Sequence, residues 1–199
     1  MIGKGKSISH GVAALEYDLA KEINGQAVAT EIARHELYGC TGAEMVQEMK
    51  PYHIDFPNVK NNCLRFEVSP SIEESATFTD ADWAELGNDF MQRMGLANHQ
   101  YIIIRHSGTE SKKEQAHLHI LANRVSLSGE LYRDNWIGKK ATEAANAIAK
   151  ERNFVQSQDI GKVNKAEIKE AMDGVLKKMQ GFDFTKFKEE LGKRGFKVR

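Results

Sequence analysis

The stretch 117–126, HLHILANRVS, predicts a β-strand with an HxH motif at its start. Alternate residues of a strand share a face, so the odd-numbered residues from His117 to Val125 point one way. The apolar Leu118, Ile120 and Ala122 point the other way. Two imidazoles two residues apart on one face can bind a single metal ion, because neutral imidazole is a common metal ligand.

A third ligand is expected from the preceding strand. The segment 101–106, YIIIRH, is a buried strand by composition and ends in His106. If it pairs with 117–126, residues 107–116 form the connecting loop and the three histidines come together. Surface or hydrogen-bonded histidines would explain the HxH pair alone, but a third histidine at an adjacent strand end favours a metal site.

The remaining pattern predicts a mixed α/β (α+β) fold with a mostly antiparallel central sheet. The HxH motif lies on a central strand, helices pack on the sheet, and the C-terminal third is helical. Thr79 is a predicted N-cap, with Asp80 and Asp82 in the first turn, where the helix macrodipole favours them. The expected helices are 9–23, 41–49, 79–94, 135–152, 164–179 and 184–192, and the expected strands are 63–68, 101–106, 117–126 and a short one through residue 132.

Composition excludes several classes of protein. An apolar fraction of 41% excludes a mostly disordered chain. The longest aliphatic run, 102–104, is far shorter than the roughly 20 residues that span a bilayer, so no membrane segment is expected. Cys40 and Cys63 form no CxxC pair and no disulfide framework, which favours a reducing cytoplasm.

The charge is balanced overall but uneven along the chain. Residues 1–136 carry 13 basic and 19 acidic side chains, whereas residues 137–199 carry 15 basic and 9 acidic ones. A basic face for phosphate contacts is therefore compatible with zero net charge, because such contacts depend on local charge. A solvated, lysine-rich helical tail would explain the charge equally well.

The first predicted helix presents a tyrosine away from its apolar stripe. Val12, Leu15, Leu19 and Ile23 form the stripe, and Tyr17 lies roughly 150° from its centre at 100° per residue. A half-solvated tyrosine is the ordinary interpretation. The alternative is a phenol that attacks a metal-bound phosphate, since covalent catalysis divides phosphodiester cleavage into two reversible transesterifications.

Three passages together resemble a known family. They are MIGKGKSISHGVAALEYDLAKE (1–22), RHSGTE (105–110) followed by HLHILANRV (117–125), and DNWIGKKATEAANAIAKERNF (134–154). The chain resembles the relaxases, or mobilisation nucleases, of mobilisable plasmids and integrated elements, within the HUH endonuclease superfamily. The first passage resembles the motif with the nucleophilic tyrosine, which falls on Tyr17, and the second resembles the three-histidine metal site. Residues 1–155 would form the nuclease core, and 156–199 a basic helical extension.

The resemblance implies strand-specific nicking and religation of single-stranded DNA at an origin of transfer, with accessory mobilisation proteins as partners. His106, His117 and His119 would hold Mg²⁺ or Mn²⁺, and Tyr17 would form a phosphotyrosine intermediate. Asn123 and Arg124 would orient a histidine or contact phosphate. Lys139 and Lys140 would contact the DNA backbone. Trp136 would stack on a base or, as the favoured alternative, cap a helix from within the core.

The sequence departs from the family pattern in the second passage. Gly108 stands where many members have an acid, and residues 111–115 appear as an insertion. Glu110 or Glu114 is therefore an alternative third ligand, and Tyr38 is a reserve nucleophile. Two other functions stay open: a non-catalytic module that binds single-stranded DNA, and a rolling-circle replication initiator or transposase of the same superfamily.

Overall fold

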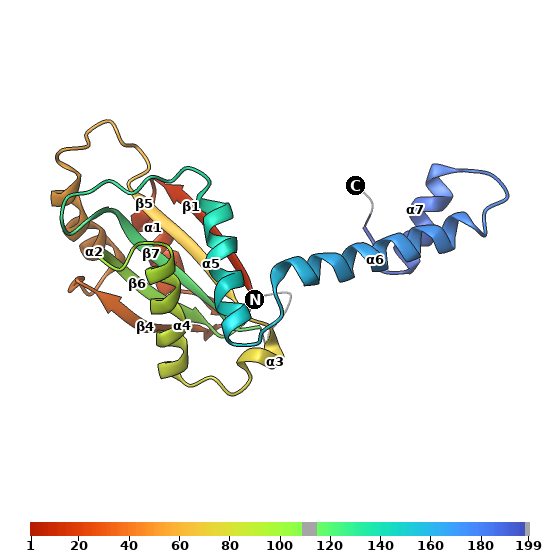
Figure 1. Ribbon diagram of the computed structural model, residues 1–199, viewed down its shortest axis with the longest axis horizontal. Helices are drawn as coiled ribbons and strands as arrows, with labels where there is room; N and C mark the ends of the chain where they lie inside the picture. The colour runs from red at the N-terminus through yellow and green to blue at the C-terminus, as the bar shows by residue number, and fades with distance from the viewer. Residues whose placement is uncertain (109–114, 198–199) are drawn as a thin grey trace. The chain divides into compact units, whose positions relative to one another are not determined.

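The computed structural model describes residues 1–108 and 115–197. Two compact units divide the chain, Met1–Gln156 and Ser157–Arg199 (Figure 1). Among the described residues, no helix combines the length and apolarity that crossing a membrane requires.

The first unit is built on a five-stranded sheet in the order β1-β5-β7-β6-β4. Every pairing in this sheet is antiparallel among the described residues, and β7, which carries the HxH motif, is the central strand. The predicted fold class is therefore confirmed. The strands are β1 (Ile2–Ile8), β4 (Ala29–His35), β5 (Cys63–Ser69), β6 (His99–His106) and β7 (His117–Ser126).

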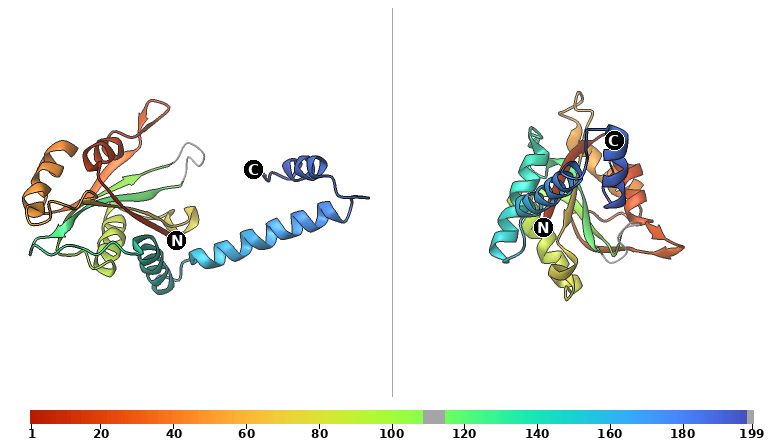
Figure 2. Two further views of the ribbon diagram at one scale, coloured as in Figure 1. Left: turned by 90° about the horizontal axis from the view of Figure 1, so that it is seen from above. Right: turned by 90° about the vertical axis from the view of Figure 1, so that its right-hand side faces the viewer.

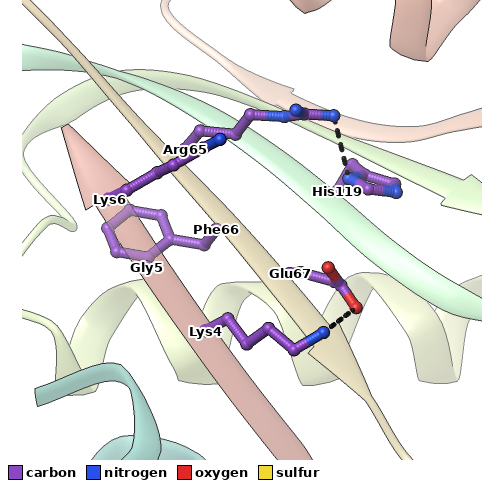
Figure 3. Close-up of a pocket in the computed structure, with 7 residues that line it drawn as sticks. All are labelled: Lys4, Gly5, Lys6, Arg65, Phe66, Glu67 and His119. Carbon is purple, nitrogen blue, oxygen red and sulfur yellow. Dashed lines mark hydrogen bonds and ion pairs between the residues drawn. The ribbon is translucent and has the colours of Figure 1, made fainter. Parts of the chain in front are cut away.

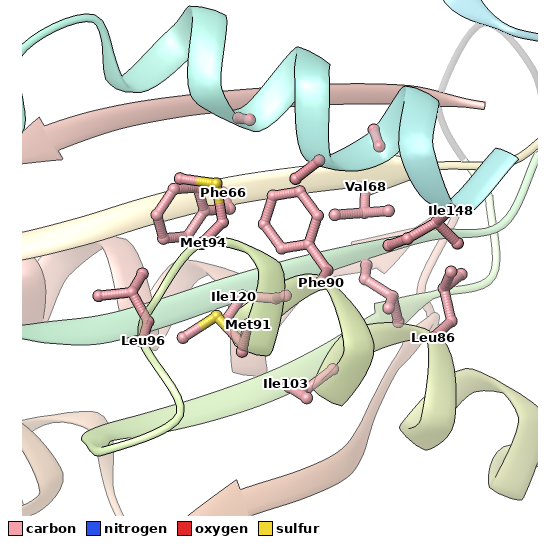
Figure 4. Packing of buried hydrophobic residues seen from close by; sticks show 14 of the residues in the cluster. Phe66, Val68, Leu86, Phe90, Met91, Met94, Leu96, Ile103, Ile120 and Ile148 are labelled. Atoms are coloured by element: carbon pink, nitrogen blue, oxygen red, sulfur yellow. The ribbon is translucent and has the colours of Figure 1, made fainter. Parts of the chain in front are cut away.

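Helices cover both faces of the sheet, as Figure 2 shows. On the histidine face, α1 (Gly11–Leu19) and α2 (Gly42–Met49) pack on Ile102, Ile104 and Leu121. A 3-10 turn, η1 (Lys50–His53), follows α2. On the other face, α4 (Asp80–Arg93) and α5 (Ile137–Glu151) enclose the larger core with the sheet (Figure 4). A short helix, α3 (Ile72–Ser75), precedes α4.

Local sequence signals explain several element boundaries. The Thr79 side chain accepts a hydrogen bond from the Asp82 amide, and Asp82 bonds back to the Thr79 amide, which makes a complete capping box at the start of α4. Thr41 and Glu44 form the same box at α2. Helix α4 therefore begins where the predicted cap places it, and α2 begins at the start of the predicted helix 41–49.

The predicted helix 9–23 is wrong at its C-terminal end. Helix α1 stops at Leu19, and the chain forms a small hairpin of β2 (Glu22–Ile23) and β3 (Gln26–Ala27). The two-residue turn is Asn24-Gly25, with φ angles of 54° and 75°. Asn-Gly favours this left-handed geometry and is a strong hairpin signal, so turn chemistry overrides the helical spacing of Ile23.

The sequence analysis also missed the two edge strands, β1 and β4. In β1, IGKGKSI, alternation places Lys4 and Lys6 on the histidine face and Gly3 and Gly5 on the α5 face. Two glycines lower strand propensity, which hides the pattern. They are needed because α5 approaches closely: a Cβ on Gly3 would lie 2.6 Å from the Ala145 Cβ.

The second unit is a pair of helices, α6 (Ser157–Leu176) and α7 (Phe184–Lys193). Its small core consists of Ala171, Val175, Phe187 and Leu191. Helix α6 begins seven residues before the predicted position 164.

The contact between β1 and α5 yields a stability prediction. We expect Gly3→Ala to lower the free energy of unfolding by about 1–3 kcal/mol, because the new methyl group overpacks the interface. Gly138→Ala is the matched control on the same contact: its Cβ would meet nothing closer than the Gly5 carbonyl oxygen at 3.5 Å. Urea unfolding of both variants tests this, and equal stabilities would contradict it.

Candidate functional site

Three histidines gather at one end of the paired strands β6 and β7. His106 ends β6 and lies directly opposite His117, the first residue of β7, while His119 is opposite Ile104. One nitrogen from each ring lies within 4.8 Å of the others, and His106 and His117 are buried. The structure thus brings together the three predicted ligands, whereas Glu110 and Glu114 fall outside the described residues.

Hydrogen bonds orient two of these rings. His106 Nε2 is 2.7 Å from the Asp18 carbonyl oxygen, and His117 Nδ1 is 3.2 Å from the Gln115 carbonyl oxygen. Because a carbonyl oxygen can only accept, both nitrogens carry the proton, and the lone pairs lie on His106 Nδ1 and on His117 Nε2, which contacts His119 Nε2. Such bonds to the second nitrogen are how proteins fix metal-binding histidines.

Burial favours the neutral form of the His106 and His119 imidazoles. It lowers the pKa of His119 to about 2, helped by the nearby His106 and His117, and it also lowers the pKa of His106. His117 Nε2 and His119 Nε2 are 3.0 Å apart. That separation suits two ligand atoms at right angles around an ion with metal–nitrogen distances of about 2.1 Å. The three side chains therefore fit a divalent metal ion.

A buried carboxylate that the sequence analysis missed links this cluster to the first helix. Asp18 is 1% exposed and forms a two-pronged ion pair with Arg65 of β5, in which Arg65 Nε donates to Oδ2 at 3.1 Å. Its Oδ1 lies 3.8 Å from His119 Nδ1. Desolvation raises the pKa of Asp18, and the charge of Arg65 opposes that rise. Asp18 thus places an acid near the histidines from α1, whereas many family members have an acid at the position of Gly108.

The buried face of α1 differs from the predicted stripe. Gly11, Ala14, Leu15 and Asp18 are buried, whereas Val12 is exposed, so the helix is rotated relative to the expectation. The tight approach of Gly11 to the Cys63 Sγ atom allows this rotation. The sequence did contain a signal for the burial of Asp18. This residue follows Leu15 by three positions and Ala14 by four, which places it on the same helix face as these two apolar residues.

Tyr17 precedes Asp18 in α1 and lies at the surface. Its side chain is 56% exposed, and its hydroxyl oxygen accepts a hydrogen bond of 2.7 Å from Lys21 Nζ. Consecutive helical residues point about 100° apart, so Asp18 faces the histidines while the Tyr17 side chain projects into solvent.

The reserve tyrosine, Tyr38, lies at the other end of the sheet. It follows β4, which ends at His35, and His35 pairs with Tyr101 of β6. Tyr101 is five residues from His106 on the same strand, so these two residues are about 17 Å apart. Its hydroxyl donates to Glu36, which raises its pKa and opposes phenolate formation.

The predicted DNA contacts of Asn123 and Arg124 do not fit the observed geometry. Asn123 shares the histidine face but is fully buried, and its Oδ1 accepts a hydrogen bond of 2.6 Å from His53 Nε2. Arg124 forms an ion pair with Asp134 and donates to the Tyr132 and Asn61 carbonyl oxygens. Both side chains therefore have structural roles within the protein, and a DNA contact of either stays a prediction.

Lys139 and Lys140 begin α5, on the opposite side of the sheet from the histidines. Lys140 Nζ donates to the Arg133 carbonyl oxygen and lies over the Tyr132 ring, and Lys139 is 3.8 Å from Glu143. Trp136 immediately before α5 is 80% exposed, so the favoured expectation of a core residue is wrong. Any DNA contact of these residues requires a strand that passes around the sheet edge.

A hollow opens on the histidine face next to His119 (Figure 3). Residues of β1 and β5 line it, and Lys4, Lys6 and Arg65 give it a positive charge that Glu67 reduces. Lys4 is bonded to Glu67 at 2.9 Å, and Arg65 Nη2 is 3.4 Å from His119 Nδ1. An anionic ligand at the histidines would therefore meet Arg65 and Lys6 on this side.

The chain was compared with known proteins. A family model described as Relaxase: MobA/VirD2-like, nuclease domain matches residues 17–154. The chain belongs to the relaxase family. The match includes α1 from Tyr17 onward and all three histidines, so the cluster lies within the relaxase nuclease domain.

No curated protein matches the relaxase chain. Among solved structures, it is similar to the conjugative relaxase TrwC in its metal-bound complex with oriT DNA, with a TM-score of 0.46 and 12% sequence identity. The similarity covers 80% of this chain and 70% of TrwC.

The Asp18 geometry yields a prediction on metal affinity. Asp18→Asn should weaken Mn²⁺ binding by about 10–100-fold, because the lost carboxylate no longer holds Arg65, whose guanidinium contacts His119 Nδ1. Titration calorimetry measures this, with circular dichroism to verify folding. Glu67→Gln is the matched control, since Glu67 lies on the same face but is bonded to Lys4. Equal affinities of wild type and Asp18→Asn would contradict this role.

The buried His119 predicts a pH dependence of stability. Its pKa is about 2 when folded, against about 6.5 when unfolded, so the unfolded chain binds one more proton between these values. Stability should therefore fall as the pH drops below about 6.5, by up to about 1.4 kcal/mol per pH unit from this residue. Urea unfolding in chelator near pH 6 and pH 5 tests this. His119→Gln should decline less steeply, and an unchanged slope would refute the prediction.

Proposed function

We propose that this relaxase domain nicks and religates single-stranded DNA at an origin of transfer by metal-assisted tyrosine transesterification. The observation that carries the proposal is the cluster of His106, His117 and His119, whose ring nitrogens lie within 4.8 Å of one another beside the helix that carries Tyr17. Membership of the relaxase family supports the DNA substrate.

The three histidines would hold Mg²⁺ or Mn²⁺. When bound, such an ion would withdraw electron density from the scissile phosphate and would stabilise the negative charge on its oxygens. Arg65 and Lys6, which line the adjoining hollow, would hold the neighbouring phosphates of the strand. Lys21, which is bonded to the Tyr17 hydroxyl, would add positive charge where the phosphate is attacked.

Tyr17 is the proposed nucleophile. Its hydroxyl would lose a proton, its oxygen would form a bond to phosphorus, and the bond from phosphorus to the 3′ oxygen would break. The 3′ oxygen would leave as a hydroxyl, and the 5′ end would stay joined to the protein as a phosphotyrosine. Because this exchange conserves the number of phosphoester bonds, the reverse attack would religate the strand.

Asp18 supports this assignment of Tyr17. The Asp18 carbonyl oxygen accepts a hydrogen bond from His106, and the Asp18 carboxylate lies 3.8 Å from His119 Nδ1. The contacts that position these two proposed ligands therefore also position α1, the helix that carries Tyr17. Residues 156–199 would act as a basic helical extension outside this core, and accessory mobilisation proteins remain predicted partners.

Covalent capture of DNA tests the nucleophile. Wild-type protein incubated with single-stranded origin DNA and Mn²⁺ should form a DNA–protein adduct that chelator abolishes, and peptide mass mapping should place it on Tyr17. Tyr17→Phe should lose the adduct, whereas the matched control Tyr38→Phe should retain it. An adduct of undiminished yield in Tyr17→Phe would assign the nucleophile elsewhere. DNA binding without any adduct would favour a non-catalytic binding module.

A further inference from the structure

Trp136 exposes its indole ring to solvent and has a strained backbone conformation. It is 80% exposed, whereas the second tryptophan, Trp83, is 2% exposed. Its φ and ψ angles of 58° and 27° lie in the left-handed region, which is unfavourable for a bulky residue. The fold therefore presents a large aromatic face outward, and no hydrophobic contact of the core explains it.

The surroundings of Trp136 are positively charged. Arg133 is exposed, and Lys139 and Lys140 lie one turn along α5, where they line a shallow hollow with the indole and Glu143. The acidic residues nearby are engaged: Asp134 is paired with Arg124, and Glu143 lies 3.8 Å from Lys139. An aromatic face next to cations suits a ligand that offers both a flat ring and negative charge.

The sheet edge connects this surface to the histidine site. The Gly138 Cβ position, two residues after Trp136, is 3.5 Å from the Gly5 carbonyl oxygen of β1. Lys6 follows Gly5 and pairs across the sheet with Arg65, which reaches His119. Because β1 is an edge strand, a chain of phosphates can cross Arg65 and Lys6 and continue around the edge to Trp136.

We propose that Trp136 is a stacking platform for a base of single-stranded DNA whose backbone crosses β5 and β1 over Arg65 and Lys6. This inference rests on the proposed DNA substrate. It explains why an indole is kept exposed and strained, since base stacking requires an accessible aromatic face. Single-stranded DNA is favoured over a protein partner because three basic residues, Arg133, Lys139 and Lys140, lie near the indole and one acid, Glu143, lines the same hollow.

Binding of an uncut oligonucleotide in chelator tests the inference apart from catalysis. With a thymidine oligonucleotide of about 20 residues, we expect Trp136→Ala to weaken binding by about tenfold and Trp136→Phe, which retains an aromatic face, by no more than about threefold. DNA should quench the tryptophan fluorescence of wild type but not of Trp136→Phe, whose remaining tryptophan is buried. Unchanged affinity in Trp136→Ala would overturn the proposal.

The proposed path has its own control. Each phosphate contact contributes about 0.7 to the slope of log affinity against log salt for a single strand, so Lys6→Ala should reduce the slope by about that amount. Lys150→Ala, at the far end of α5, should leave it unchanged, and equal slopes for both variants would refute the path. Loss of the Tyr17 adduct with retained Trp136-dependent binding would remove the nuclease proposal and leave this one standing.

Discussion

The buried ion pair between Asp18 and Arg65 is the constraint on which the site depends. It joins α1 to β5, and the same aspartate reaches two of the three histidines, one through its carbonyl oxygen and one through its carboxylate. Removing one partner of such a pair is costly, because the other charge is left buried and unpaired. The pair therefore fixes the helix that carries Tyr17 at the histidine cluster.

The two faces of the sheet differ in how completely helices cover them. On one face, α4 and α5 bury a continuous apolar core, and glycines in β1 let α5 pack against the strand. On the other, α1 and α2 cover only part of the sheet and leave β1 and β5 exposed beside His119. Charged and polar side chains occupy this uncovered part, so an anionic ligand that bound at the histidines would meet them there.

Polar residues on the histidine face divide into structural and chemical groups. Asn123 and His53 bind one another and anchor η1 to the sheet, although Asn123 has the same sequence alternation as the metal-binding candidates. His106, His117 and His119 instead keep nitrogens directed at a common point. Alternation in sequence assigns a face but does not distinguish these roles, because the distinction depends on partners from other elements.

The sequence by itself determined the fold class, the capped helices, the HxH strand and the third histidine, because period-two alternation and capping chemistry are local. Tertiary structure alone decided the rest. The Asn24-Gly25 turn ended α1 early, packing against α5 made a strand of the glycine-rich β1, and rotation of α1 buried Asp18. The exposure of Trp136 was likewise invisible in sequence, since burial depends on what packs against a side chain and not on its own type.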